Sequence, residues 1–265
     1  MAKNVKVIVL RTAGTNCNAE TAFAFRSFGA QVDQVHIKKL IDQEVYIRDY
    51  HILAIPGGFT YGDDIESGRI LANELSRKLG PDICQFIGDQ KLIIGICNGF
   101  QVLVKSGILP GPLDDNEAKA HDSSQKATLF NNNSGKFEAR WTHLKVEGKS
   151  PWLANIKEIS LPIAHGEGHY VISQKEYKKM RENKEIAFVY QKGEICKFQN
   201  LEKNPNGSDY DIAGVLAYNG RVLGLMPHPE RAMFTHQSPM WQMNKSKNKV
   251  GSGLQIFKNA INYFK

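Results

Sequence analysis

The stretch Lys91-Leu-Ile-Ile-Gly-Ile-Cys97-Asn-Gly-Phe-Gln101 decides the fold. After the lysine it is a continuous apolar run, which is typical of a strand buried on both faces. A helical pattern follows through Lys105, so Cys97 lies at the turn from strand to helix, with a glycine two residues away on each side. This G-x-C-x-G pattern is the cysteine counterpart of the nucleophile elbow, in which the nucleophile is strained and the glycines prevent collisions. The N–H groups of the helix N-terminus would stabilise a thiolate. The stretch therefore predicts a nucleophilic Cys97, and a buried structural cysteine beside two turn glycines is the alternative.

Short apolar runs and helical patterns alternate on both sides of this stretch. Helices are expected at Asn18–Phe28 and Ile70–Leu79, and a last one from Ser252, as N-cap, to Phe264. Further strands are expected at Val5–Leu10, Val32–Ile37, Ile52–Ile55, Leu144–Val146, Ile186–Tyr190, Ile212–Ala217 and Val222–Leu225. Buried strands separated by helices predict an α/β fold with a parallel, doubly wound sheet, whose site lies beyond the carboxyl ends of the strands. We expect one domain over residues 1–265, with the polar stretch Pro112–Lys126 as a surface excursion.

The composition excludes several classes of protein. The chain has 265 residues, 42% of them apolar and 23% charged, as in an ordinary globular protein. No apolar run reaches the roughly 18 residues of a membrane span, and the first segment lacks the cleavage site of a signal peptide, so a cytoplasmic protein without membrane contact is expected. The net charge is +7, but the basic residues are scattered, which favours a solvated surface over a nucleic-acid site. The cysteines have no C-x-x-C spacing, so neither a disulfide framework nor a metal site is expected.

A thiolate nucleophile needs a proton donor for the leaving amine, and His228 is the strongest candidate. It follows an apolar strand in Met226-Pro-His-Pro-Glu230, where the two prolines restrict the backbone. In an extended chain, residues two apart face the same way, so Glu230 can orient the imidazole. His165 in Ala164-His-Gly-Glu-Gly-His169 is a rival base. The pair of histidines in that segment resembles a zinc pair, but its glycines argue against the required helix.

The loop Pro56-Gly-Gly-Phe-Thr-Tyr-Gly-Asp63 follows the strand at Ile52–Ile55. A tetrahedral intermediate needs two N–H donors. One is expected from Asn98, directly after the nucleophile, and the second from Gly58, because a paired glycine lets the backbone approach closely. A phosphate-binding loop is the alternative, but the sequence contains neither of the glycine-rich phosphate-binding motifs, G-x-x-x-x-G-K-[ST] and G-x-G-x-x-G.

These pieces together resemble the class I (triad) glutamine amidotransferases, whose glutaminase domain is a flavodoxin-like α/β fold. The resemblance extends to Arg11-Thr-Ala-Gly-Thr-Asn-Cys-Asn18 and Asn204-Pro-Asn-Gly-Ser208, and it covers nearly the whole chain. It implies that Cys97 is the nucleophile, His228 the acid–base and Glu230 its orienter. It also implies a set of residues that bind the substrate glutamine, namely Phe59, Thr60, Gln101, His165, Gly166 and Glu167. The early loop departs from the family pattern at Thr12-Ala13, where an aromatic residue and a proline are usual.

Within that class the chain is similar to glutaminase subunits that serve a large synthetase in purine biosynthesis, often with a small third subunit. The resemblance implies hydrolysis of L-glutamine to glutamate and ammonia, with delivery of ammonia to the partner. It implies no cofactor on this chain, and ATP and magnesium on the synthetase. The alternatives are a glutaminase of a different amidotransferase, a cysteine hydrolase of the same broad fold, and a non-enzymatic basic binding module.

Overall fold

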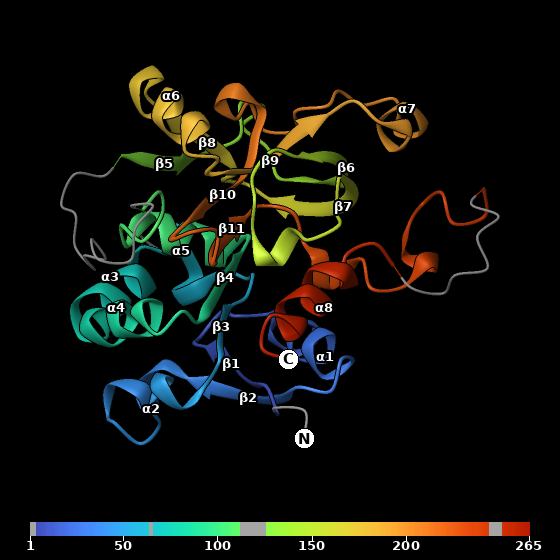
Figure 1. The fold of residues 1–265 in the computed structure, drawn as a ribbon. Coiled ribbons are helices and arrows are strands. Elements are labelled where there is room, and N and C mark those ends of the chain that lie inside the picture. The colour runs from blue at the N-terminus through green and yellow to red at the C-terminus, as the bar shows by residue number, and fades with distance from the viewer. Residues whose placement is uncertain (1–3, 64–65, 112–125, 244–250) are drawn as a thin grey trace.

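The computed structural model describes residues 4–63, 66–111, 126–243 and 251–265. Their strands are β1 (Lys6–Arg11), β2 (Gln31–His36), β3 (Ile52–Ile55), β4 (Leu92–Ile96), β5 (Ala127–Phe130), β6 (Glu138–Val146), β7 (Glu158–His165), β8 (His169–Ile172), β9 (Ile186–Gln191), β10 (Ile212–Ala217) and β11 (Val222–Leu225). A nine-stranded sheet has the order β2-β1-β3-β4-β11-β10-β9-β6-β7 (Figure 1), and β5 pairs with β8 separately.

The first five strands of the large sheet are parallel. Their order is that of a flavodoxin-like doubly wound sheet, so the predicted fold class is confirmed. Every residue of β3, β4 and β11 is buried, as the continuous apolar runs predict. Because the carboxyl ends of parallel strands meet at one edge, the turns after these three strands lie together.

Helices cover both faces of the parallel strands. The helices of the described residues are α1 (Asn18–Arg26), α2 (Ile37–Ile41), α3 (Arg69–Lys78), α4 (Gly80–Gly88), α5 (Asn98–Lys105), α6 (Gln174–Glu182), α7 (Glu194–Gln199) and α8 (Leu254–Asn262), of which α6 and α7 lie at the other half of the molecule. In Figure 1, α1 and α8 lie on one side, and α3, α4 and α5 on the other. On the first side, the rings of Phe25 and Phe257 meet edge to face with their centroids 4.9 Å apart.

Beyond β11 the sheet becomes antiparallel, so the predicted parallel sheet describes only its first half. The change comes at the tight turn between β10 and β11, where Tyr218, Asn219 and Gly220 all have positive φ angles. A turn this short can join only antiparallel strands, whereas parallel neighbours need a long crossover.

Two further predictions differ from the structure. Ser252 does not cap the last helix: the cap residue is Gly253, and the Ser252 hydroxyl instead donates to Ser160 O at 2.9 Å. The polar stretch predicted at Pro112–Lys126 lies, apart from Lys126, outside the described residues. Within the ranges that the structure describes, none of the helices has the length and apolar character needed to cross a membrane.

Candidate active site

Cys97 lies at the turn between β4 and α5, as the sequence predicts. Its backbone is strained, with φ 52° and ψ −107°. The glycines on either side are required by close packing, because a Cβ at Gly95 would lie 2.5 Å from Gly99 O. A Cβ at Gly99 would lie 1.9 Å from Ile55 O. The turn therefore presses the start of α5 against β3 and presents Cys97 at the carboxyl edge of the sheet.

His228 follows β11, the neighbour of β4 in the sheet. Its backbone N–H donates to Pro162 O at 2.8 Å, and its Nδ1 lies 2.7 Å from Glu230 Oε1. Both side chains are fully enclosed, with exposed fractions of 2% and 0%. Burial alone would lower the pKa of His228, but the negative charges of Glu230 and Cys97 raise it well above its usual range. Glu230 thus orients the imidazole and stabilises the imidazolium.

The Cys97 and His228 side chains converge over Gly57. A Cβ at Gly57 would lie 2.8 Å from His228 Cε1 and 3.4 Å from Cys97 Cβ, so only glycine fits between them. In the described part of the chain, His228 Nε2 is a buried nitrogen without a hydrogen-bond partner. This nitrogen is therefore available for proton transfer, and the Cys97 thiol contacts Ala164 O at 3.6 Å.

The two predicted oxyanion donors flank the nucleophile. Gly58 has a φ of 147° and packs against the loop at Gly14–Asn16. The Asn98 side chain ties the elbow to the next loop, because its Oδ1 accepts from Thr60 Oγ1 at 2.8 Å and its Nδ2 donates to Gln101 Oε1 at 2.9 Å. Among the loop hydrogen bonds of the described residues, neither the Gly58 nor the Asn98 backbone N–H is a donor. Both N–H groups are thus left for a ligand oxygen.

A cavity of about 180 Å³ opens at Cys97. It is lined by Gly58, Phe59, Ser67, Cys97, Gln101, Asn131, Phe137, Ala164, His165, Gly166 and Glu167. It is smaller than the roughly 300 Å³ typical of pockets for drug-sized molecules, so it suits a single amino acid. A larger hollow of about 980 Å³, beside β6 and β7, contains none of the predicted site residues.

The predicted substrate residues line this cavity with one exception. Thr60 is buried behind the cavity and contacts Asn98 instead. The Gln101 side chain donates from Nε2 to Glu167 O at 2.6 Å, which joins α5 to the loop Gly166–Gly168. At the mouth of the cavity the Phe59 and Phe137 rings stand 6.4 Å apart, and both are exposed.

His165, the rival base, is held as a neutral ring. Burial, together with the nearby charge of His228, lowers its pKa to about 3. Its Nδ1 lies 3.1 Å from Asn132 Oδ1 and its Nε2 lies 3.5 Å from Asn206 Nδ2. Because both ring nitrogens are engaged within the protein, His228 remains the better candidate for the base.

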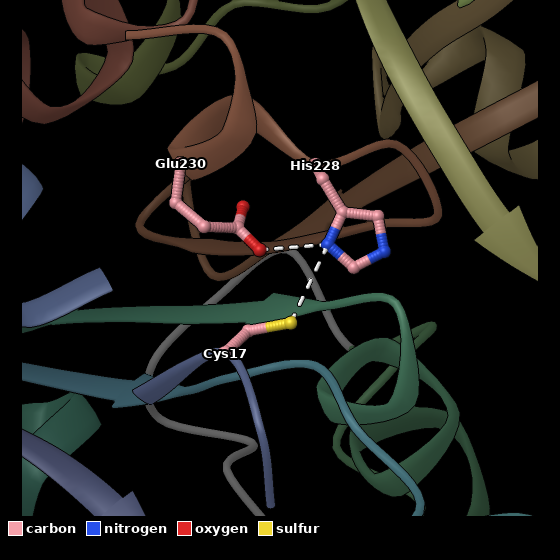
Figure 2. A group of neighbouring side chains, drawn as sticks. All are labelled: Cys17, His228 and Glu230. Atoms are coloured by element: carbon pink, nitrogen blue, oxygen red, sulfur yellow. Dashed lines mark hydrogen bonds and ion pairs between the residues drawn. The ribbon is translucent and has the colours of Figure 1, made fainter. Parts of the chain in front are cut away.

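Cys17 is a neighbour of the triad that the sequence did not indicate. Figure 2 shows Cys17 and Glu230 meeting the same nitrogen of the His228 ring, and Cys17 Sγ lies 3.9 Å from that Nδ1. Arg231 donates from Nη2 to the sulfur at 3.0 Å. Burial raises the pKa of the Cys17 thiol, which therefore stays protonated. No local pattern reveals this contact, since the early loop and β11 meet only in the folded sheet.

Cys17, His228 and Glu230 bring three possible metal donors within 4.8 Å of one another. Two features oppose a metal here. The Nδ1–Oε1 separation of 2.7 Å is shorter than the ~3.3 Å expected between tetrahedral ligands of zinc. The Arg231 guanidinium also places a positive charge against the sulfur. The group is better suited to orienting His228 than to holding a cation.

Lys105 is a second residue that sequence reasoning missed. Its side chain is fully buried, and Nζ lies 3.0 Å from Glu66 Oε1 and 3.7 Å from Glu167 Oε2. Nζ also donates to Ser67 O at 2.6 Å. A buried ammonium is stable only when it is paired in this way, and the contacts tie the end of α5 to two loops around the cavity.

Residues 4–264 match the family model described as a CobB/CobQ-like glutamine amidotransferase domain. The chain therefore belongs to the glutamine amidotransferases. The phosphoribosylformylglycinamidine synthase subunit PurQ of Dehalococcoides mccartyi is 44% identical, over 98% of this chain and 97% of its own. The subunit of the same name from Methanococcus maripaludis strain C5 is 41% identical, over 98% of both chains. Within the class, the chain belongs to the family of PurQ subunits.

The solved structures agree with this placement. A chain of PurLQS from Thermotoga maritima has a TM-score of 0.74 and 30% identity, covering 99% of this chain and all of its own. A putative GMP synthase subunit from Thermoplasma acidophilum, 14% identical with a TM-score of 0.55, shares the fold alone. The relatives therefore favour a PurQ-type glutaminase over the glutaminase of a different amidotransferase.

Proposed function

We propose that this chain hydrolyses L-glutamine to glutamate and ammonia, with Cys97 as nucleophile, His228 as acid–base and Glu230 as its orienter. The observation that carries the proposal is the placement of a buried, Glu230-bound imidazole beside the strained Cys97 turn. The Nε2 of this imidazole has no partner among the described residues.

The reaction proceeds in two halves. The Cys97 thiol passes its proton to His228 Nε2 and the sulfur attacks the carboxamide carbon, while the Gly58 and Asn98 N–H groups stabilise the negative oxygen of the tetrahedral intermediate. His228 Nε2 gives its proton to the leaving nitrogen, so ammonia departs and a thioester remains. A water molecule then loses a proton to His228 and attacks the thioester, which releases glutamate and restores the thiol. The sum is glutamine and water converted to glutamate and ammonia.

The ammonia serves a partner. The relatives are subunits of phosphoribosylformylglycinamidine synthase, and the Thermotoga structure is that of PurLQS. We assign to the large subunit the ATP- and magnesium-dependent conversion of formylglycinamide ribonucleotide to formylglycinamidine ribonucleotide, and no cofactor to this chain. A small third subunit completes the complex.

The proposal includes a cytoplasmic location. The four cysteines, all within the described residues, form no disulfide, which suits a reducing compartment.

Labelling with diazo-oxonorleucine, a reactive analogue of glutamine, tests the proposal. Mass spectrometry of the digested protein should find one adduct, on Cys97, and excess glutamine should prevent it. Cys17, Cys84 and Cys196 are internal controls for non-specific alkylation. An adduct on another cysteine, or labelling that glutamine does not affect, would contradict the assignment.

A further inference from the structure

The segment Asn204–Ser208 takes no part in the chemistry above, yet it reaches the cavity loop. The loop Gly166–Gly168 lies between this segment and a second one that carries Asn132. The side chains of Asn132, Asn206 and Ser208 are all buried, with exposed fractions of 3%, 1% and 3%. A buried amide or hydroxyl is costly unless it is hydrogen-bonded, so these residues need partners in the loop.

Asn132 holds the first side of the loop. Its Nδ2 donates to His165 O at 2.8 Å, and its Oδ1 accepts from Gly168 N at 3.0 Å. A carbonyl on one side and an N–H on the other leave only one orientation for this amide. His165 Nδ1 must then be the protonated nitrogen, because it faces Asn132 Oδ1.

Asn206 and Ser208 hold the other side. Asn206 Nδ2 donates to Gly168 O at 2.8 Å, while its Oδ1 accepts from Ser208 N at 3.1 Å. The Ser208 hydroxyl lies 3.1 Å from the same Gly168 O and accepts from Tyr170 N at 3.0 Å. The Nδ2 of Asn206 also faces His165 Nε2, the unprotonated nitrogen of the ring. The Ser208 hydroxyl has a second acceptor in Asn206 Oδ1, at 2.7 Å, so each of these side chains has its partners within the protein.

The ring of His165 completes the arrangement. A Cβ at Gly168 would lie 2.2 Å from His165 Cε1, so the loop closes directly over the ring. A buried polar network in which every member is satisfied specifies a single geometry. The loop it holds lines the cavity through Gly166 and Glu167, and it bonds Gln101 through Glu167 O.

We propose that Asn132, Asn206 and Ser208 are positioning residues that set the affinity for glutamine, by holding the loop Gly166–Gly168 in its binding geometry. The proposal rests on glutamine being the substrate, as inferred above. A loop that already has its binding geometry loses little conformational freedom when the ligand binds. The residues that hold the loop therefore strengthen ligand binding without contacting the ligand. None of these three residues contacts Cys97, so the rate of the chemical steps should depend on them only weakly.

Asn206→Asp tests the proposal with almost no change in volume. It places a carboxylate oxygen against Gly168 O or His165 Nε2, where the amide donated. In the complex reconstituted with the large and small subunits, we expect KM for glutamine to rise at least ~10-fold, as for a buried group left unsatisfied. The kcat for glutamate release should stay within about three-fold. Asn73→Asp is the matched control, since the same change is made at an exposed position on α3, and it should leave KM unaltered.

Ser208→Ala, which removes only one oxygen, is the second variant and should raise KM several-fold. Synthesis from added ammonium salts, which does not use this site, reports folding and assembly of each variant. An assembled variant with unchanged KM, or with a lower kcat at unchanged KM, overturns the proposal. So does the loss of ammonia-dependent synthesis in both variants, because the network would then support the fold rather than the loop. If the parent complex releases no glutamate, the proposed function itself has failed.

Discussion

The two ring nitrogens of His228 lie in unlike surroundings, and each can be tested separately. Nδ1 is held 2.7 Å from Glu230, whereas Nε2 has no partner among the described residues. His228→Ala removes the proton donor, and we expect glutaminase turnover to fall by roughly 10²–10⁴-fold. Glu230→Gln keeps the shape of the side chain, so the loss should be large but smaller. Near-normal turnover in His228→Ala would point to His165 instead.

The same glutamate sets the pH range of the reaction. Burial lowers the pKa of His228, and the Glu230 carboxylate is the first of the charges that raise it well above its usual range. Replacing this carboxylate by an amide removes that charge, so the pKa of His228 should fall. The imidazolium would then be lost at a lower pH. We expect the alkaline limb of the kcat profile of Glu230→Gln to shift to lower pH, and an unshifted limb would exclude this coupling.

In the proposed mechanism, Cys97 is needed only for making ammonia. Cys97→Ser replaces the thiol by a hydroxyl, which is a far weaker nucleophile in this setting. In the assembled complex we expect glutamine-dependent synthesis to disappear while synthesis from ammonium salts continues. Both rates are measured on one preparation, so each serves as the control for the other. Loss of both rates in a folded, assembled complex would contradict the role of Cys97.

Among the elements, the junction of β4 and α5 tolerates little added volume. Gly99→Ala would place a methyl group 1.9 Å from Ile55 O, and overpacking of this kind costs ~1–3 kcal/mol. We expect a lower thermal midpoint and a large loss of glutaminase activity, because the whole elbow must shift. Gly88→Ala at the end of α4 is the matched control, since nothing lies within 4 Å of its added Cβ. Equal midpoints for the two variants would show that the elbow can relax.

The elements that the sequence predicts well are those with local signals. The β4 run and the G-x-C-x-G turn combine burial with glycine spacing. The predicted pairing of His228 with Glu230 is present, but the extended chain predicted for it is wrong beyond His228, because Pro229–Arg231 forms a 3-10 helical turn. Elements whose sequences combine features of different structures were not predicted. The charged helix α6 buries only Met180, and β7 contains Pro162, which disfavours a strand. The roles of Cys17, Lys105 and Asn206 arise from segments that meet only after folding, so no local pattern could indicate them.

For the whole molecule, we predict that a partner controls catalysis. A glutaminase that ran alone would release ammonia into water, where it is protonated and lost to the synthase. The Phe59 and Phe137 rings at the mouth of the cavity are exposed, so a docked subunit can press on the two loops that carry these rings, one of which contains Gly58. Docking would then favour the closed loops, as any population shift requires.

The expected result is slow glutamate release by the chain alone, rising at least ~10-fold when the large subunit and its nucleotide are added. That factor corresponds to about 1.4 kcal/mol of barrier. Steady-state glutamate release with and without the partner measures it, and Cys97→Ser in the same complex gives the background. Equal rates would mean that the loops already have their active geometry in the free chain.

Strand β11 enters the sheet between β4 and β10, although among the strands of the described residues it is the last to leave the ribosome. Proteins are made from the N-terminus, so the Cys97 turn is synthesised well before the segment that carries His228 and Glu230. A chain interrupted before Val222 would contain the thiol without its proton shuttle. An unfinished or prematurely terminated chain therefore cannot hydrolyse the cell's glutamine. Hydrolysis begins only after β11 has been inserted into the sheet between β4 and β10.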